Sequence, residues 1–115
     1  MKLSELKRHQ DVVAEALKDP AYRAEWERTR LAHEVAMKVI QYRVEHNLTQ
    51  TELARRLGMR QPHVARLEAG DHEPSLATLR RLARVLGLEF HIDITPDTIS
   101  LTAYSPTSRA PAAAT

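Results

Sequence analysis

The chain has 115 residues, which is enough for one ordinary domain and too few for two independent cores. It has no cysteine, which excludes disulfides, thiolate metal ligands and cysteine nucleophiles, and it has no apolar run of the roughly 18 residues that a membrane span needs. The net charge is only +2, but residues 47–87 carry seven basic side chains, all arginine, against four acidic ones, and we expect a soluble, cytoplasmic protein with a basic middle segment.

The first part of the chain predicts two helices. Apolar residues recur at helical spacing from about Leu3 to Lys18, and Asp19-Pro20 ends this helix because the residue before a proline is displaced from helical geometry. A second, long helix is expected from Pro20 to about Glu45, since this stretch has no glycine and no further proline. A break near Thr29 would split it, and this alternative stays open.

Three short helices with clear end signals follow. A T-x-x-E capping box at Thr49 begins the first, and Gly58 ends it. Gln61-Pro62 opens the second, which ends at Gly70. Ser75 caps the third, whose leucines form one apolar face.

The hydrophobic period then changes to two. Apolar and polar side chains alternate from Leu88 to Thr95, which predicts a strand that stops at Pro96, and residues 98–102 are only a weak candidate for a second strand. The strand has no evident partner in its own chain, so we expect it to pair with the same strand of a second copy through Leu88, Phe90, Ile92 and Ile94. Residues 97–115 are expected to be a disordered tail.

The middle segment predicts two helices that cross at a tight turn at Gly58. Leucines, a valine and the small Ala54 face inward from the two helices, which leaves one side of the second helix exposed. That side carries polar and basic residues suited to the edges of bases, and a helix fits the major groove, which is about 12 Å wide. These residues are Arg60, Gln61, His63 and Arg66.

Residues from about Val35 to Leu86 resemble the helix-turn-helix domain of the Cro/CI-type (XRE) family of bacterial and phage repressors. The resemblance rests on L-T-Q at 48–50, E-L-A at 52–54, Gly58, L-E-x-G at 67–70 and P-S-x-x-x-L at 74–79. It implies a lambda-repressor-like helix-turn-helix bundle. With the elements above, the expected fold is all-α: a five-helix bundle with an N-terminal helical extension and one C-terminal β-strand that pairs across a dimer. The expected parts are an extension (1–34), a DNA-binding domain (35–87), a dimerisation strand (88–96) and the tail (97–115).

The same resemblance implies roles by position on double-stranded operator DNA. Gln50 is expected to clamp a phosphate at a helix N-terminus, and the second helix is expected to contact base edges, with only an apolar contact from Pro62. The expected DNA-binding residues are Thr49, Gln50, Thr51, Arg60, Gln61, Pro62, His63 and Arg66. Arg43 and Glu68 match a family pair that is typically buried and salt-bridged, although two solvated side chains remain the alternative.

The sequence L-K-D-P-A-Y-R-A-E-W-E-R at 17–28, followed by the long helix, resembles HigA-like antitoxins of type II toxin–antitoxin modules. In that family the antitoxin neutralises a RelE-like (HigB-like) toxin that cleaves mRNA on the ribosome, and it represses its own operon. The resemblance implies toxin-binding residues Tyr22, Glu25, Trp26 and Glu27. The alternatives are a stand-alone XRE-family repressor without a toxin partner and, less favoured by the exposed basic helix, a protein-bridging adaptor.

The sequence favours no enzyme, and we expect no catalytic residue, no cofactor and no metal. His33-Glu34 begins the H-E-x-x-H pattern of zinc proteases, but Met37 stands where the second histidine is needed. There is neither a glycine-rich phosphate loop nor a nucleophile elbow around any serine.

Overall fold

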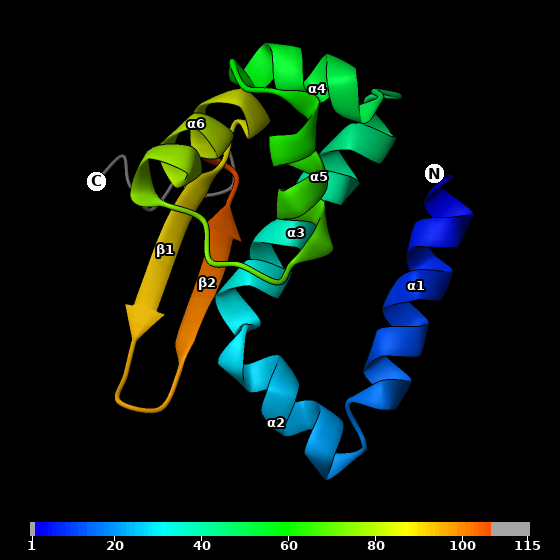
Figure 1. The fold of residues 1–115 in the computed structure, drawn as a ribbon, viewed down its shortest axis with the longest axis vertical. Coiled ribbons are helices and arrows are strands. Elements are labelled where there is room, and N and C mark those ends of the chain that lie inside the picture. Colours follow the sequence, from blue (N-terminus) through cyan, green and yellow to red (C-terminus); the bar gives the residue numbers. More distant parts are fainter. Residues whose placement is uncertain (1, 107–115) are drawn as a thin grey trace.

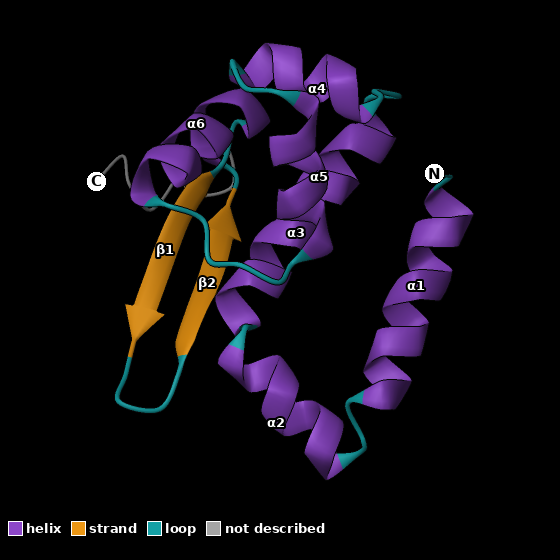
Figure 2. Ribbon diagram, viewed as in Figure 1, coloured by secondary structure: helices purple, strands orange, loops and turns teal. Residues whose placement is uncertain are grey.

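The protein is described by a computed structural model in which residues 2–106 are placed. Within this range it is mostly helical, with a small two-stranded sheet (Figures 1 and 2). In chain order the elements are α1 (Leu3–Ala16), α2 (Pro20–Arg28), α3 (Arg30–Glu45), α4 (Gln50–Leu57), α5 (Gln61–Ala69), α6 (Leu76–Leu86), β1 (Glu89–Ile94) and β2 (Ile99–Tyr104). No helix in this range has the length and apolar character that crossing a bilayer demands.

The long helix predicted from Pro20 to Glu45 is broken at Thr29, so the described residues contain six helices instead of five. Thr29 leaves helical geometry (φ −117°, ψ 26°), and its hydroxyl lies 2.7 Å from Nε2 of His33. Across the break, the rings of Trp26 and His33 stack with centroids 3.7 Å apart. The break lets α2 turn away from the axis of α3 (Figure 1).

Helix α3 is the centre of the fold because it is apolar on two sides. One side joins α4, α5, α6 and the sheet in the main core, whose almost fully buried side chains are Val35, Val39, Leu53, Val64 and Leu82. The other side, through Ile40 and Val44, forms a small second cluster with Leu6 of α1. The N-terminal helix is therefore joined to the body mainly at one point.

The expectation that the first strand has no partner in its own chain is wrong. β1 pairs antiparallel with β2, with Ile92 opposite Leu101, so residues 99–104 of the predicted disordered tail form a strand. The apolar and polar alternation of β2 is weak, and its position is fixed by tertiary packing: Leu101 is buried in the main core, and its N–H donates to Glu34 of α3 over 2.7 Å. The last part of the predicted tail, 107–115, lies outside the described residues.

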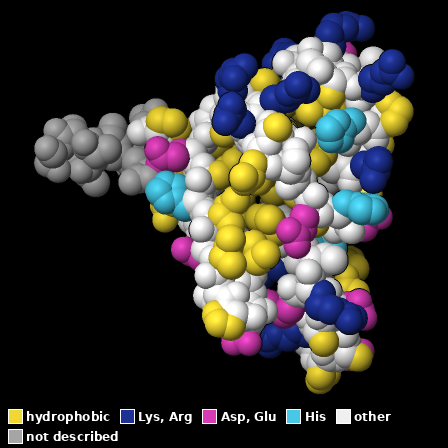
Figure 3. Space-filling model, turned by 60° about the vertical axis from the view of Figure 1, so that its left-hand side comes forward, with side chains coloured by type: hydrophobic (Ala, Val, Ile, Leu, Met, Phe, Trp, Pro, Cys, Tyr) yellow, Lys and Arg dark blue, Asp and Glu magenta, His cyan; other side chains and the backbone are white. Residues whose placement is uncertain are grey.

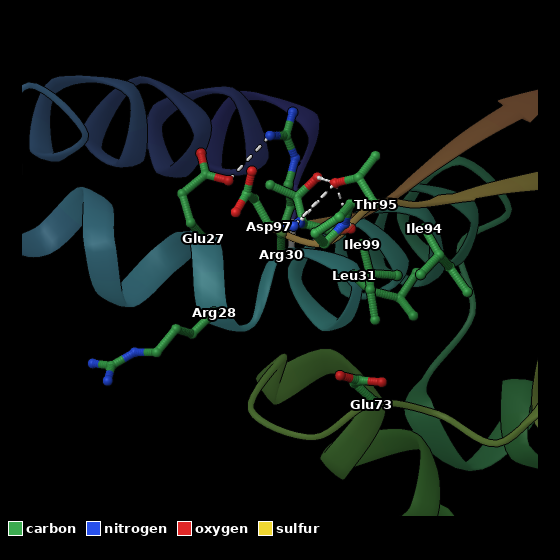
Figure 4. Close-up of a pocket in the computed structure, with 11 residues that line it drawn as sticks. Glu27, Arg28, Arg30, Leu31, Glu73, Ile94, Thr95, Asp97 and Ile99 are labelled. Atoms are coloured by element: carbon green, nitrogen blue, oxygen red, sulfur yellow. Dashed lines mark hydrogen bonds and ion pairs between the residues drawn. The ribbon is translucent and has the colours of Figure 1, made fainter.

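The turn of the hairpin rests beside the junction of α2 and α3, around a hollow of about 270 Å³ (Figure 4). Thr95 closes the turn, because its backbone N–H donates to the carbonyl of Thr98 over 2.9 Å. On the helical side, Arg30 forms ion pairs with Glu27 at 3.2 Å and with Glu34 at 2.8 Å. The pair with Glu27 joins α3 to α2, and Glu34 also accepts from the N–H of Leu101 in β2, so this group of side chains connects both helices and the hairpin.

Candidate DNA-binding surface

Helix α4 begins at a complete capping box. The hydroxyl of Thr49 accepts from the N–H of Glu52 over 3.1 Å, and the Glu52 carboxylate accepts from the N–H of Thr49 over 2.9 Å. Hydrogen bonds from Thr49 hold the pKa of the Glu52 carboxyl below its usual value, so the box is made with a charged carboxylate. The cap fixes the direction in which Gln50, the first residue of α4, leaves the helix.

The turn between α4 and α5 is made by Gly58, whose φ of +69° lies in the left-handed region that favours glycine. Arg81 of α6 donates to the Gly58 carbonyl over 3.2 Å and so ties the turn to a third helix. Pro62 lies in the first turn of α5, where its missing N–H costs no helical hydrogen bond. Buried leucines, Ala54 and Val64 pack the two helices against each other beneath this turn.

A chain of polar side chains joins α3, α4 and α5. The guanidinium of Arg43 donates to the Glu68 carboxylate from two of its three nitrogens, over 2.6 Å from Nε and 2.9 Å from Nη2. The amide of Gln50 donates to Glu68 over 3.0 Å and accepts from the amide of Gln61 over 2.8 Å. The Arg43 and Glu68 side chains are only 13 % and 8 % exposed, so this pair lies inside the domain.

The expected DNA-binding residues lie on α4, on α5 and at their N-terminal ends, and they differ in how exposed they are. Six of them are exposed, namely Thr49, Thr51, Arg60, Pro62, His63 and Arg66. Gln50 and Gln61 are half-buried, and each already uses part of its amide in the chain of hydrogen bonds. The surface is therefore a fixed frame of two glutamines with exposed basic and polar side chains around it.

Sequence reasoning missed Arg81, which lies beside the helix turn. Arg81 lines an open hollow together with Gly58, Arg60 and Arg66, among others, so α6 adds a cation to the start of α5. The signal for it was the run of arginines in residues 47–87, which composition alone could not assign to a face. Figure 3 shows Lys and Arg side chains gathered at the end of the molecule that carries α4.

The four residues expected to bind a toxin lie on α2, but they do not form one free patch. Trp26 is half-buried by its stack on His33, Glu27 is paired with Arg30, and Glu25 is paired with Arg28. Tyr22 is exposed, with its ring centroid 6.2 Å from that of Trp26. Trp26 and Glu27 also line a groove of about 660 Å³ whose walls come from α1, α2, α3 and β2.

Among the described residues, no group of three or more His, Cys, Asp or Glu side chains is arranged to hold a metal ion.

Comparison with known proteins shows that the segment carrying this surface is similar to helix-turn-helix sequences. The helix-turn-helix family matches residues 39–92. Antitoxin HigA1 of Mycobacterium tuberculosis (strain H37Rv) is 37 % identical over 75 residues, which cover 64 % of this chain and 50 % of the relative. The chain thus spans about half the length of this antitoxin.

Two archaeal relatives match along more of their own length. An uncharacterised HTH-type transcriptional regulator of Methanothermobacter thermautotrophicus is 44 % identical over 54 residues, covering 47 % of this chain and 78 % of the relative. Another from Methanocaldococcus jannaschii is 36 % identical over 52 residues, covering 45 % of this chain and 79 % of the relative. No solved structure gives a significant match.

Proposed function

Because the chain belongs to the XRE-type helix-turn-helix family of DNA-binding regulators, we propose that it is a repressor that reads its operator with α5 in the major groove. The observation that carries this proposal is the chain of hydrogen bonds from Arg43 through Glu68 and Gln50 to Gln61. It holds α4 and α5 in one arrangement before DNA arrives, which lowers the ordering cost of binding.

Residues of α4 contact the phosphates, and residues of α5 contact the bases. The first turn of α4 presents backbone N–H groups and the side chains of Gln50 and Thr51 to a phosphate. The exposed side of α5 presents Arg66 and His63 to base edges, and Gln61 reads a base with an amide whose plane is set by Gln50. Lys and Arg near this surface supply the charge that attracts DNA at a distance.

The DNA-binding test uses the region upstream of the protein's own gene. Arg66→Ala is expected to weaken binding to the cognate site by about 1–3 kcal/mol and to relax preference at one position, whereas Gln50→Ala weakens all sequences alike. The matched control is Arg23→Ala on α2, an exposed arginine on another element. Fluorescence anisotropy at several salt concentrations measures these affinities. An affinity that changes neither with salt concentration nor with Arg66→Ala would exclude the mechanism.

We propose further that the repressor is an antitoxin that neutralises a RelE-like (HigB-like) toxin and represses its own operon. The support is the similarity to antitoxin HigA1 and the groove beside Trp26 and Glu27, which lies away from the α4–α5 surface and leaves both surfaces available. The alternative is a stand-alone repressor, which the archaeal relatives favour because they are HTH-type transcriptional regulators that match less than half of this chain.

The antitoxin test co-expresses this chain with a candidate toxin, the product of a small basic reading frame sought beside this gene, and measures growth rescue. The wild-type chain is expected to restore growth, and Tyr22→Ala on the exposed side of α2 is expected to reduce rescue. Arg66→Ala serves as the matched control, because it impairs DNA binding and leaves rescue intact. Absence of any growth effect of the neighbouring protein, or of any complex between the two, favours the stand-alone repressor.

Repressors of this architecture read two half-sites one DNA turn, roughly 34 Å, apart, and this requires two copies of α5. We therefore propose that the protein acts as a homodimer. An operator with two related half-sites, protected together in a footprint, is the expected result. Equal affinity for one half-site and for the paired sites would contradict it.

A further inference from the structure

The outer edge of β1 carries a row of main-chain groups that face away from β2. At the turn the N–H of Thr95 donates to the carbonyl of Thr98, so these two residues turn main-chain groups toward each other, and such inward-facing positions alternate along an antiparallel ladder. The residues whose N–H and C=O groups turn outward on β1 are therefore Phe90, Ile92 and Ile94. The same rule turns the N–H of Leu101 outward on β2, where it donates to Glu34, which supports the assignment.

The two edges of the hairpin differ. The edge of β2 lies against α3, and the Glu34 carboxylate occupies the N–H at its middle. The edge of β1 pairs with no strand among residues 2–106, and β1 contains neither proline nor lysine, the residues that commonly protect such an edge. An extended segment added to this sheet would therefore join at β1.

The apolar side of β1 is also only partly covered. Ile94 is 74 % exposed, and Phe90 and Ile92 are only partly buried against the main core. Figure 3 shows an apolar area in the middle of the face that comes forward from the α6 and β1 side.

We propose that the edge of β1 pairs antiparallel with β1 of a second copy, in the register that places Ile92 opposite Ile92. This interface deepens the homodimer of the proposed function and rests on it. An antiparallel pair of identical strands is self-complementary about a two-fold axis, so it closes as a dimer. In this register Ile94 of each copy lies opposite Phe90 of the other, which covers the exposed apolar side chains.

Charge selects this register over its neighbours. When Ile92 lies on the axis, His91 of each copy faces Asp93 of the other, twice in the dimer. A register centred on His91 sets Glu89 against Asp93, and one centred on Asp93 sets two identical carboxylates opposite each other. Within its own chain His91 contacts Glu89 over 2.9 Å and the Tyr104 ring edge-on, so its position is already restricted.

The chain has no cysteine, so introduced thiols report the register directly. In the proposed ladder, residues 91 and 93 of opposite copies are a non-hydrogen-bonded pair with Cα atoms about 4.5 Å apart, close enough for a disulfide. We expect a mixture of His91→Cys and Asp93→Cys proteins to form a disulfide-linked heterodimer faster than either variant alone forms a homodimer. Faster linkage of either variant to itself would overturn the register.

Charge variants test the interface without thiols. Asp93→Lys is expected to raise the dimer dissociation constant about tenfold, since an ammonium replaces the carboxylate that each His91 faces and cannot accept a hydrogen bond from it. His91→Glu combined with Asp93→Lys sets opposite charges across both pairs and restores dimerisation. Asp97→Lys, at the hairpin turn, is the matched control and leaves dimerisation unchanged. Sedimentation velocity measures the three; a monomeric wild type, or equal effects of Asp93→Lys and Asp97→Lys, would overturn the interface.

The same variants separate this inference from DNA binding. A single operator half-site in a short duplex is read by one copy, so Asp93→Lys should bind it like the wild type, with loss only on the paired site. A chain that binds half-sites but stays monomeric overturns the interface and leaves the regulator intact. A dimer that binds no DNA overturns the regulator and leaves the interface intact.

Discussion

Glu68 is the residue at which three helices meet. Its carboxylate accepts from Arg43 of α3 and from Gln50 of α4, and it stands on α5 itself. Inside the domain a carboxylate stripped of such donors, or a guanidinium stripped of its carboxylate, is strongly unfavourable. The position therefore links the stability of the domain to the orientation of the surface glutamines.

Glu68→Ala is expected to lower the free energy of unfolding by about 3 kcal/mol, because it leaves the Arg43 side chain, which is only 13 % exposed, without its counterion. Urea denaturation followed by circular dichroism measures the change. The matched control is Glu15→Ala, which breaks a pair with Lys18 that is 75 % exposed on both sides and costs less than about 1 kcal/mol. Similar losses in the two variants would show that the Arg43 pair is no more than a surface contact.

Gly58 and Gly70 share a φ of +69° but differ in surroundings. A Cβ at Gly58 meets nothing within 4 Å, whereas at Gly70 it lies 3.0 Å from Nδ1 of His33 and 3.3 Å from Cβ of Ala36. Gly58→Ala is expected to cost about 1 kcal/mol from backbone strain, and Gly70→Ala about 1–2 kcal/mol more from overpacking. Thermal unfolding ranks the two variants; an equal loss would contradict the packing term.

At the level of elements, the sequence predicted those helix ends that are set by residues close to them in the chain. The capping box at Thr49, the left-handed Gly58 and the Ser75 cap gave the ends of α4 and α6 because each acts within four residues. The break at Thr29 had no such signal, since it is accompanied by a ring stack between Trp26 and His33, one of which lies on each side of it. Such a stack depends on the folded geometry around it.

Long-range contacts account for the rest of what the sequence did not predict. β2 has a weak alternation, and its place depends on Leu101 packing against α3 and on Glu34, 67 residues earlier. The bond from Gln61 to Gln50 joins residues 11 apart, so the sequence could suggest both as DNA contacts and not their link to each other. The sequence could predict which residues form the candidate site. The hydrogen bonds that hold these residues in place became visible only in the folded structure.

The junction of α2 and α3 is expected to respond to pH through His33. Burial lowers the pKa of His33 from its ordinary 6.5, with the nearby Asp71 acting in the opposite direction. A histidine whose folded-state pKa is depressed contributes stability above pH 6.5, and this contribution is lost as the pH falls through the folded-state value. The free energy of unfolding of the wild type should therefore fall more between pH 7 and pH 5 than that of His33→Gln.

Trp26 provides a second measurement of the same event, because it is the only tryptophan in the chain and it stacks on His33. Protonation of the stacked ring is expected to change the Trp26 emission with a midpoint below 6.5, and His33→Gln should abolish this transition. His46→Gln, which alters a histidine stacked on Tyr42, serves as the control. An unchanged emission profile in His33→Gln would contradict the assignment.

At the scale of the whole molecule, the protein is a closed domain with a lightly attached arm. Helices α3 to α6 and the hairpin share the main core, whereas α1 buries one leucine, Leu6, against Ile40 and Val44. Few buried apolar contacts allow a segment to open without global unfolding. The arm can therefore rearrange on a partner while the DNA-binding surface keeps its shape.

Leu6→Ala is expected to release α1 while α4 to α6 stay folded, since it removes most of the apolar contact of the arm. Amide hydrogen exchange should show protection lost in residues 3–16 by about tenfold or more and unchanged in residues 50–86. Val12→Ala, at a side chain that is 62 % exposed, is the control. Loss of protection across both regions would mean that the arm and the domain unfold together.

The carboxylate of Glu34 has a consequence for solubility. Sheets can grow without limit when both of their rims accept further strands, as in fibrils. Here the edge of β2 is blocked by the carboxylate of Glu34, which accepts a main-chain N–H of that edge and is held in place by a salt bridge to Arg30. Strand pairing through the other edge, that of β1, must therefore end once two copies have joined. The chain can thus expose one strand edge without forming polymers.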